Sequence, residues 1–255
     1  MLKKRLIFNL LMDESYFVIS RNFTIQRFGD KQWLINQYNF DKITESIDEI
    51  IILNISRDNI NYDQFLDNVK FISKKCFIPI SVGGNINNYD RAECVFKSGG
   101  DKIVLNSSLF EKPELVNQIS KNYGSQSIIA SIDVKKINNQ YEVFIRNGSK
   151  NVGKFEEYIK YVNNLHIGEI IINSIDKDGT GNGYDLDIFD SNLFKNINKP
   201  IILSGGAGKD VHFKNGLNID FVDAVSTSHL FNFIGDGLIN VRKFLLKNNF
   251  NLAIR

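Results

Sequence analysis

The sequence predicts a (β/α)8 barrel, because eight short apolar runs alternate with segments of helical spacing. Most runs are continuously apolar rather than alternating, as expected for strands buried on both faces of a parallel sheet. Four pairs of positions in or beside these runs share one offset of 122 residues, which indicates two homologous half-barrels. The offset joins Gly83 to Gly205, Asn54 to Asp176, Asp101 to Asp223 and Leu11 to Asp133.

The predicted strands, in chain order, are Leu6–Met12, Glu49–Ile55, Ile78–Val82, Lys102–Asn106, Ser127–Asp133, Glu169–Ile175, Ile201–Ser204 and Phe221–Thr227. Between them, apolar residues recur at helical spacing, as at Phe65, Val69 and Ile72. Pro113 suits the first turn of a helix, and an amphipathic segment around Leu238–Leu246 closes the chain. No composition shift marks a domain boundary, so residues 1–255 are expected to form one barrel domain.

Three connections are longer than a barrel requires, and all three leave the carboxyl ends of strands. Residues Asp13–Asp30 predict a polar and aromatic loop in the position of an active-site lid. Residues Lys135–Gly153, with a turn at Asn147-Gly148, predict a β-hairpin after the fifth strand. Residues Asp178–Gly183 are glycine-rich enough to fold over a ligand. Chemistry is therefore expected at the carboxyl face of the barrel.

Composition narrows the classes of function. The chain is 43% hydrophobic and 24% charged, and its formal charge of +2 gives no electrostatic reason to expect nucleic acid or an anionic membrane as partner. No window of about 18 residues is continuously apolar and uncharged, so we expect no membrane insertion and a cytoplasmic location. Metal-ligand spacing is absent from the sequence, and no cofactor is expected.

Two Gly-Gly turns at the carboxyl ends of strands predict phosphate sites, because glycine lets backbone N–H groups approach an anion. If the halves are related by a twofold axis, Gly83-Gly84 and Gly205-Gly206 lie opposite each other across the barrel mouth. This suits a small molecule phosphorylated at both ends, or two smaller phosphates, while a plain glycine-rich turn is the alternative. The residues expected around these turns are Asn106, Ser107, Ser174, Asp178, Gly179, Ser228 and His229.

Asp133 ends the fifth predicted strand and is the best candidate for a catalytic acid or base. A carboxylate at a strand end is also commonly a helix cap, so its position alone leaves both interpretations open. No Ser-His-Asp or Cys-His spacing indicates a nucleophilic site.

Nine short motifs within residues 1–250 carry a family resemblance. They are Lys-Lys-Arg5, Asp48-Glu49, Val82-Gly-Gly84, Gly100-Asp-Lys-Ile103, Tyr123-Gly-Ser-Gln-Ser127, Ser131-Ile-Asp-Val-Lys135, Gly168-Glu-Ile170, Asn173-Ser-Ile-Asp-Lys-Asp-Gly-Thr180 and Ser204-Gly-Gly-Ala-Gly-Lys209. Together they resemble the HisF family, the cyclase subunits of imidazole glycerol phosphate synthase, which are half-barrel-repeat (β/α)8 proteins of the histidine pathway.

The resemblance implies a partner and a route for ammonia. In the family, a HisH glutaminase docks on the amino-terminal face of the barrel and releases ammonia, which passes through the core to a bisphosphate at the other face. The family's gate is a ring of four charged residues, which would be costly to bury unless mutually paired. The corresponding residues here are Arg5, Glu49, Lys102 and Glu169 for the gate, Ser81 for a channel-lining hydroxyl and Asp101 for the aspartate that faces the glutaminase.

The carboxyl face departs from the family pattern. The family's cyclase uses two aspartates, of which Asp133 is present on strand five while Leu11 occupies the position on strand one. Losing one of two acid-base groups removes a factor of about 10²–10⁴ in rate, so imidazole ring closure is not expected. The further differences are Ile19 for the lid lysine, Asn54 for the aspartate ending strand two, Asn85 for a third glycine and His229 for a phosphate-binding serine.

The Leu-Leu pair in the first strand is more similar to the HisF-like proteins of surface-polysaccharide gene clusters. That branch is associated with a HisH-like glutaminase and a separate sugar amidotransferase, which convert an N-acetyl group of a sugar into an acetamidino group. Our primary interpretation is an ammonia-conducting subunit of such sugar amidation. One alternative is an authentic synthase subunit that makes imidazole glycerol phosphate and AICAR. A non-catalytic barrel that only activates a glutaminase is the other, although such a scaffold has no use for Asp133.

Overall fold

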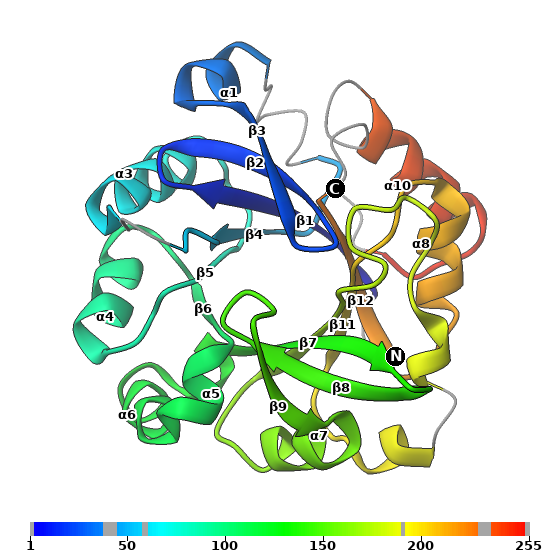
Figure 1. Cartoon of the computed structure of the whole chain (residues 1–255). Helices are drawn as coiled ribbons and strands as arrows, with labels where there is room; N and C mark the ends of the chain where they lie inside the picture. Colours follow the sequence, from blue (N-terminus) through cyan, green and yellow to red (C-terminus); the bar gives the residue numbers. More distant parts are fainter. Residues whose placement is uncertain (1–2, 38–44, 58–60, 190–191, 229–235, 253–255) are drawn as a thin grey trace.

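Eight parallel strands form a closed barrel in the computed structural model, which describes residues 3–37, 45–57, 61–189, 192–228 and 236–252 (Figure 1). In chain order the strands are β1 (Arg5–Asp13), β4 (Glu49–Asn54), β5 (Ile80–Gly83), β6 (Lys102–Leu105), β7 (Ile128–Ile137), β10 (Glu169–Ser174), β11 (Ile201–Ser204) and β12 (Val222–Thr227). Each strand pairs with its neighbour in this order, and β1 with β12 completes the ring. The predicted (β/α)8 fold is confirmed, and every predicted strand overlaps an observed one.

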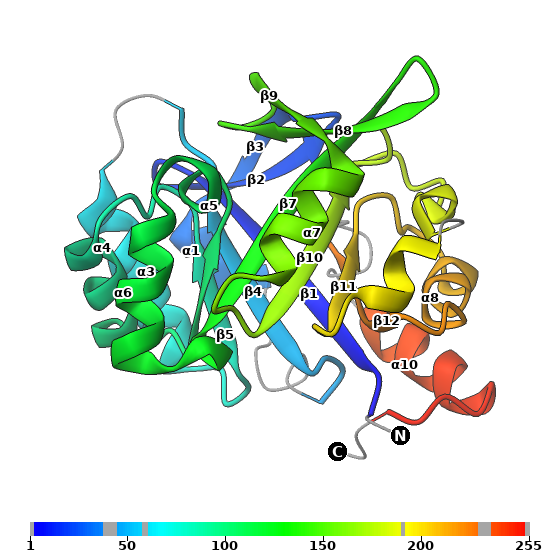
Figure 2. The ribbon, with the colours of Figure 1, turned by 90° about the horizontal axis from the view of Figure 1, so that it is seen from below.

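Helices pack around the outside of the barrel (Figures 1 and 2). They are α1 (Lys31–Gln37), α3 (Tyr62–Ser73), α4 (Tyr89–Lys97), α5 (Ser107–Glu111), α6 (Pro113–Tyr123), α7 (Phe155–Asn163), α8 (Asp210–Leu217) and α10 (Gly237–Lys247), with the 3-10 helices η1 (Ser125–Ser127), η2 (Leu186–Phe189) and η3 (Asn192–Asn196). As predicted, α6 begins at Pro113, and Phe65, Val69 and Ile72 form the buried face of α3. After β10, the described residues form η2 and η3 where an α-helix is expected.

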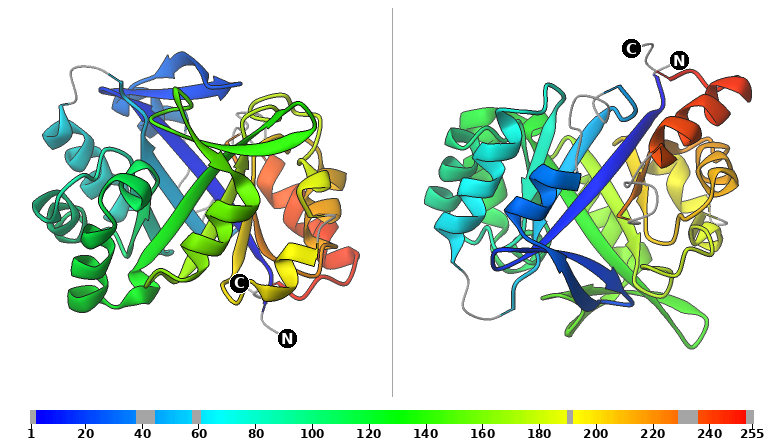
Figure 3. Two further views of the ribbon diagram at one scale, coloured as in Figure 1. Left: turned by 60° about the horizontal axis from the view of Figure 1, so that its bottom comes forward. Right: turned by 90° about the horizontal axis from the view of Figure 1, so that it is seen from above.

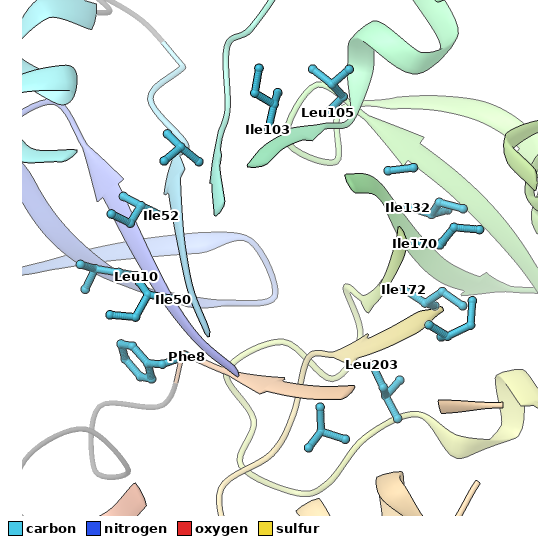
Figure 4. Packing of buried hydrophobic residues seen from close by; sticks show 14 of the residues in the cluster. Phe8, Leu10, Ile50, Ile52, Ile103, Leu105, Ile132, Ile170, Ile172 and Leu203 are labelled. Carbon is cyan, nitrogen blue, oxygen red and sulfur yellow. The ribbon is translucent and has the colours of Figure 1, made fainter. Parts of the chain in front are cut away.

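The strands separate two apolar cores, because successive side chains of a strand point to opposite faces. Phe8 and Leu10 of β1 point away from the barrel axis toward the helices, as do their counterparts on the other strands (Figure 4). Ile7, which directly precedes Phe8 in β1, points to the opposite face and belongs to a second apolar cluster inside the barrel. The members of this inner apolar layer are Ile7, Ile51, Val104, Ile129, Ile171, Ile202 and Ala224.

Two antiparallel extensions rise from one end of the barrel, while the first and last described residues lie at the other end, where Lys4 pairs with Leu252 (Figure 2). The loop predicted for Asp13–Asp30 is wrong in part, since these residues contain β2 (Tyr16–Arg21) and β3 (Thr24–Gly29). β1 continues past the barrel rim and pairs with β2, which buries Phe17 completely. The hairpin predicted after the fifth strand is confirmed as β8 (Gln140–Ile145) and β9 (Lys150–Lys154), and β8 also pairs with the extended end of β7.

Two aspartates related by the 122-residue offset make matching contacts in the two halves. Asp101 Oδ2 accepts a hydrogen bond from Ile80 N at 2.8 Å, and Asp223 Oδ2 accepts one from Ile201 N at 3.0 Å. Each carboxylate thus caps the first residue of the neighbouring strand. The shared role supports the interpretation of the chain as two related half-barrels.

A buried ion pair connects the last described helix to the first two barrel strands. Arg242 of α10 contacts both carboxylate oxygens of Asp48 at 3.2 Å, and Asp48 Oδ2 also accepts a hydrogen bond from Leu6 N at 2.8 Å. Both side chains are almost completely buried. A charge at such a position is costly without its partner.

We therefore expect Arg242→Met to lower the free energy of unfolding by about 3–5 kcal/mol, because Asp48 loses this guanidinium while remaining buried. Urea unfolding monitored by circular dichroism measures the change. Lys97→Met is the matched control, since Lys97 pairs with Glu93 on the exposed side of α4, and it should cost less than about 1 kcal/mol. Equal effects of the two variants would contradict the assigned role of the buried pair.

Candidate functional site

A cavity of about 530 Å³ opens at the carboxyl ends of the barrel strands. The β2–β3 and β8–β9 hairpins lie at the same end of the barrel (Figure 3). The floor of the cavity includes Ile51, Val104 and Ile171 of the inner apolar layer. The cavity therefore extends from the centre of the barrel to its rim. The predicted site residues that line it are Gly84, Asn106, Ser107, Asp133, Asp178 and Ser228.

Asp133 is held in the cavity by two asparagine side chains. Asn173 Nδ2 donates to its Oδ1 at 2.9 Å, and Asn106 Nδ2 donates to its Oδ2 at 3.1 Å. Restricted hydration raises the pKa of Asp133 to about 7, with a further contribution from the negative charge of Asp178, although both asparagine hydrogen bonds oppose the rise. A carboxyl group with this pKa can both accept and donate a proton near neutral pH.

Leu11 lines the same cavity from β1 and is nearly buried. The nearest acidic residue in that strand, Asp13, makes a different contact, because Arg27 of β3 donates to its Oδ2 from Nε at 3.2 Å and from a terminal nitrogen at 3.0 Å. Arg27 also pairs with Glu14. Asp13 is thus fixed in the β1–β2 hairpin by Arg27, and an apolar side chain occupies the strand-one position of the mouth.

Close backbone approaches explain the second glycine of each Gly-Gly turn. Gly84 has a φ of +86°, and a Cβ placed on it would lie 1.8 Å from the carbonyl oxygen of Asn54. A Cβ on Gly206 would lie 2.2 Å from the carbonyl oxygen of Gly183, whose N–H donates to Gly206 O at 2.8 Å. Of the four turn residues Gly83, Gly84, Gly205 and Gly206, only Gly84 belongs to the cavity lining described here.

The residues expected around the second turn are largely occupied by contacts within the protein. Ser174 is buried and donates to Asp185 Oδ2 at 3.0 Å, so its hydroxyl does not face the cavity. Gly179 packs against the backbone of Ser20 in β2. Asp178 accepts hydrogen bonds from Ser20 Oγ at 2.5 Å and Phe23 N at 3.2 Å, although burial raises its pKa. His229 lies outside the described residues.

Two arginines at the cavity rim are not found by sequence reasoning. Arg57 follows β4 and donates to the carbonyl oxygen of Phe23, while Arg146 directly follows β8 and contacts Glu111 Oε1 at 2.8 Å. Arg146 and Asn147 both have φ of +53°, a left-handed turn that lets Arg146 N reach Ser107 Oγ at 3.0 Å. The predicted hairpin contains Arg146 and is the one signal in the sequence that could have indicated it. The contacts that place Arg146 at the rim are tertiary, with Ser107 and Glu111.

Four charged residues form a closed alternating ring at the amino-terminal end of the barrel. Arg5 contacts Glu49 at 3.1 Å and also pairs with Glu169. Lys102 contacts the same two carboxylates at 3.1 and 2.7 Å. Ser81 donates its hydroxyl proton to the remaining oxygen of Glu49. Each cation therefore bridges two anions, and the sequence-predicted gate residues do lie together.

The ring is electrostatically self-compensating. Burial opposes the charge of Glu169, but the hydrogen bond and attraction from Arg5, together with Lys102, outweigh it and lower the pKa of this carboxyl. Burial also opposes the charge of Arg5, yet its contacts with Glu169 and Glu49 raise the pKa of the guanidinium. Glu169 and Arg5 are therefore held in their charged forms by the ring. The inner apolar layer separates this ring from the cavity.

Asp101 is exposed at the start of β6, one residue before Lys102 of the ring. Its Oδ2 caps β5 through Ile80 N. Within the part of the chain that the structure describes, no group of three or more His, Cys, Asp or Glu side chains is arranged to hold a metal ion. Among the described helices, none has the length and apolar character needed to cross a membrane.

The barrel is closed and parallel, and the cavity and Asp133, whose pKa is about 7, both lie at the carboxyl ends of its strands. This is the arrangement of (β/α)8-barrel enzymes. A family model described as "Histidine biosynthesis protein" matches residues 28–233. Over 240 residues the chain is 44% identical to a protein of Parasynechococcus marenigrum that is provisionally named imidazole glycerol phosphate synthase subunit hisF2; the match covers 93% of this chain and 88% of that protein.

The subunit HisF of imidazole glycerol phosphate synthase from Clostridium botulinum strain 657 is 34% identical over 258 residues, with both chains fully covered. The corresponding subunit from Chlorobium phaeobacteroides is 36% identical over 203 residues, which cover 79% of this chain and 80% of that one. The chain thus belongs to the HisF family of imidazole glycerol phosphate synthase subunits.

Asp133→Asn should change the pH dependence of stability. In the unfolded chain the carboxyl ionises near its ordinary pKa of 3.8, whereas in the fold it ionises near 7, so wild-type stability is lost between these values as pH rises. A difference of one in pKa corresponds to about 1.4 kcal/mol. The variant has no carboxyl at this position and lacks this loss. The free energy of unfolding of the variant relative to wild type, measured with urea, should therefore increase by about 2–4 kcal/mol from pH 4 to pH 8.

The comparison at pH 4 is the internal control, because the folded wild type and the variant are then both uncharged at this position. A difference between wild type and variant that is the same at both pH values would contradict the raised pKa.

Proposed function

We propose that this chain is the ammonia-receiving subunit of a glutamine-dependent complex that amidates a sugar, converting an N-acetyl group to an acetamidino group in surface-polysaccharide biosynthesis. The single observation that carries the proposal is the combination of an intact charged ring with Leu11 at the strand-one position of the mouth. The ring favours ammonia entry, while Leu11 argues against the two-carboxylate chemistry of the family's cyclase.

The proposed partner is a HisH-like glutaminase that binds the amino-terminal face as a heterodimer. Lys102 and Arg5 would part from their carboxylates to admit ammonia, and the alternating charges restore the closed ring afterwards. The inner apolar layer suits the passage of a small neutral molecule and disfavours ammonium, since an unpaired charge is costly there. Asp101 would contact the glutaminase, and a separate sugar amidotransferase would complete the assembly.

Asp133 is the proposed acid-base group at the mouth, and the polar groups around Gly84, Asn106 and Ser107 are the proposed site for a phosphorylated ligand. The rim arginines Arg57 and Arg146 add positive charge on that side of the cavity. A carboxyl with a pKa near 7 can take the proton that nitrogen loses when it forms a bond to carbon.

The alternative is an authentic imidazole glycerol phosphate synthase subunit. The names of the relatives and the presence of Asp133 favour it. It requires a second acid-base group, and Asp13 is a poor substitute because its carboxylate is engaged by Arg27. Gene neighbourhood separates the two, since histidine genes and polysaccharide genes lead to opposite answers.

Co-expression with a HisH-like glutaminase from the same gene cluster tests the partner. We expect the two chains to purify together and glutamine hydrolysis to rise on complex formation. Asp101→Asn should weaken the complex about tenfold, because it removes one interface charge while an amide oxygen can still cap Ile80 N.

Asp90→Asn is the control, since Asp90 is exposed in the first turn of α4, which follows the carboxyl end of β5. Absence of both complex and stimulation with the cognate glutaminase would refute the ammonia-receiving role.

Complementation of a histidine auxotroph that lacks its cyclase subunit tests the chemistry. We expect no growth, and with ammonium salts and the family's bisphosphate the purified chain should form little imidazole glycerol phosphate, because Leu11 supplies no proton. Leu11→Asp should recover only a trace, since Ile19 and His229 also differ from the family pattern. Robust growth with the unmodified chain would overturn the amidation proposal and establish the alternative.

A further inference from the structure

Asn9 is a buried amide whose carbonyl oxygen has no hydrogen-bond partner among the described residues. It lies on β1, two residues after Ile7 of the inner apolar layer and two residues before Leu11 of the mouth. Its side chain lines the cavity and is 6% exposed as a residue, yet Oδ1 accepts no hydrogen bond from any described group. Leaving a buried acceptor unsatisfied is unfavourable, so this oxygen calls for a donor from a bound molecule.

The orientation of the amide follows from its neighbours. Asn9 Nδ2 donates to Ser226 Oγ at 3.1 Å and to Ser204 Oγ at 3.3 Å. Ser226 Oγ donates its proton to the carbonyl oxygen of Leu203 at 3.5 Å. Ser226 Oγ can therefore only accept in its hydrogen bond with Asn9. The nitrogen therefore faces the serines, and Oδ1 is left buried beside the cavity lining with no donor among the described residues.

Hydrogen bonds and strand register connect Asn9 to Asp133 along the barrel wall. Ser204, which accepts from Asn9, is in register with Asn173 on the neighbouring strand, and Asn173 is in register with Asp133 and donates to it. The unpartnered oxygen thus belongs to a continuous polar belt that begins directly above the apolar layer and ends at the candidate acid-base group. A small molecule that crosses the apolar layer meets this belt first.

We infer that Asn9 Oδ1 is a binding site for neutral ammonia at the exit from the apolar layer. The inference rests on the proposed function, and it deepens that function by naming where the nitrogen is held. Ammonia has three N–H donors and one lone pair, so a hydrogen bond to Asn9 leaves the lone pair free for the acceptor in the mouth. Asn9 is then a positioning residue for the nucleophile.

Nuclear magnetic resonance of the isotopically labelled full chain tests the site without any acceptor substrate. Ammonium chloride is titrated at alkaline pH, where much of it is neutral ammonia, with potassium chloride at equal ionic strength as the salt control. We expect saturable shifts of the Asn9 side-chain amide and the Ser204 backbone amide with ammonium chloride alone. The response should strengthen as pH rises, because the neutral fraction rises.

Two variants make the test specific, with Ser204 as the reporter. Asn9→Ser and Asn9→Leu should each weaken the ammonia response of Ser204 at least about tenfold, which corresponds to about 1.4 kcal/mol. Two substitutions are used so that a folding defect in one does not decide the result. Asn87→Ser, at the rim of the same cavity, should leave the response unchanged.

An equal response to both salts, or an unchanged ammonia response in both Asn9 variants, would overturn the inference and leave water as the donor to Asn9. These results are distinguishable from failure of the proposed function. A chain that binds ammonia at Asn9 but no glutaminase would refute the partner and retain the site. A chain that forms the stimulated glutaminase complex without an Asn9 response would refute only the site.

Discussion

The two-residue period of side chains in a closed parallel sheet is the constraint on which this structure depends. Once β1 places Phe8 and Leu10 against the helices, Arg5, Ile7, Asn9 and Leu11 must face the interior. The same alternation in the other strands stacks a charged ring, an apolar layer, a polar belt and an open mouth along one axis. A register slip of one residue in β1, β4, β6 or β10 would place its ring charge among the outer apolar side chains.

The polar layers are arranged so that the costs of burial are offset locally. At the amino-terminal end, each cation of the ring bridges two carboxylates. At the other end, burial raises the pKa of Asp133, and the negative charge of Asp178 adds to the rise, while the two asparagine hydrogen bonds only partly oppose it. The amino-terminal end therefore carries a closed ring of paired charges, and the carboxyl end carries a carboxyl group that can exchange protons near neutral pH.

The mouth is enclosed by segments that leave three different strands. The β2–β3 hairpin docks on the loop after β10 through Asn22, whose amide reaches the carbonyl oxygens of Ile175 and Asp176 at 3.1 Å. The turn after β8 reaches the end of β4, where Asn147 Nδ2 donates to Ile55 O at 3.2 Å. These contacts join the two halves above the cavity, so the enclosure depends on all three insertions together.

The sequence by itself determined the strands, the end of the barrel that carries the cavity, the offset between the halves and the residues of the charged ring. The strands, the end of the barrel and the offset follow from local apolar runs and from strand direction, whereas the ring residues are predicted from motifs that resemble the HisF family. Only the tertiary structure decided the β2–β3 strands, the rim position of Arg146, the raised pKa of Asp133 and the unpartnered oxygen of Asn9. The last three depend on groups far apart in sequence, because the depth of a side chain in a barrel and its hydrogen-bond partners are set by register and closure. β2 and β3 pair locally, but their docking on the loop after β10 is also a long-range contact.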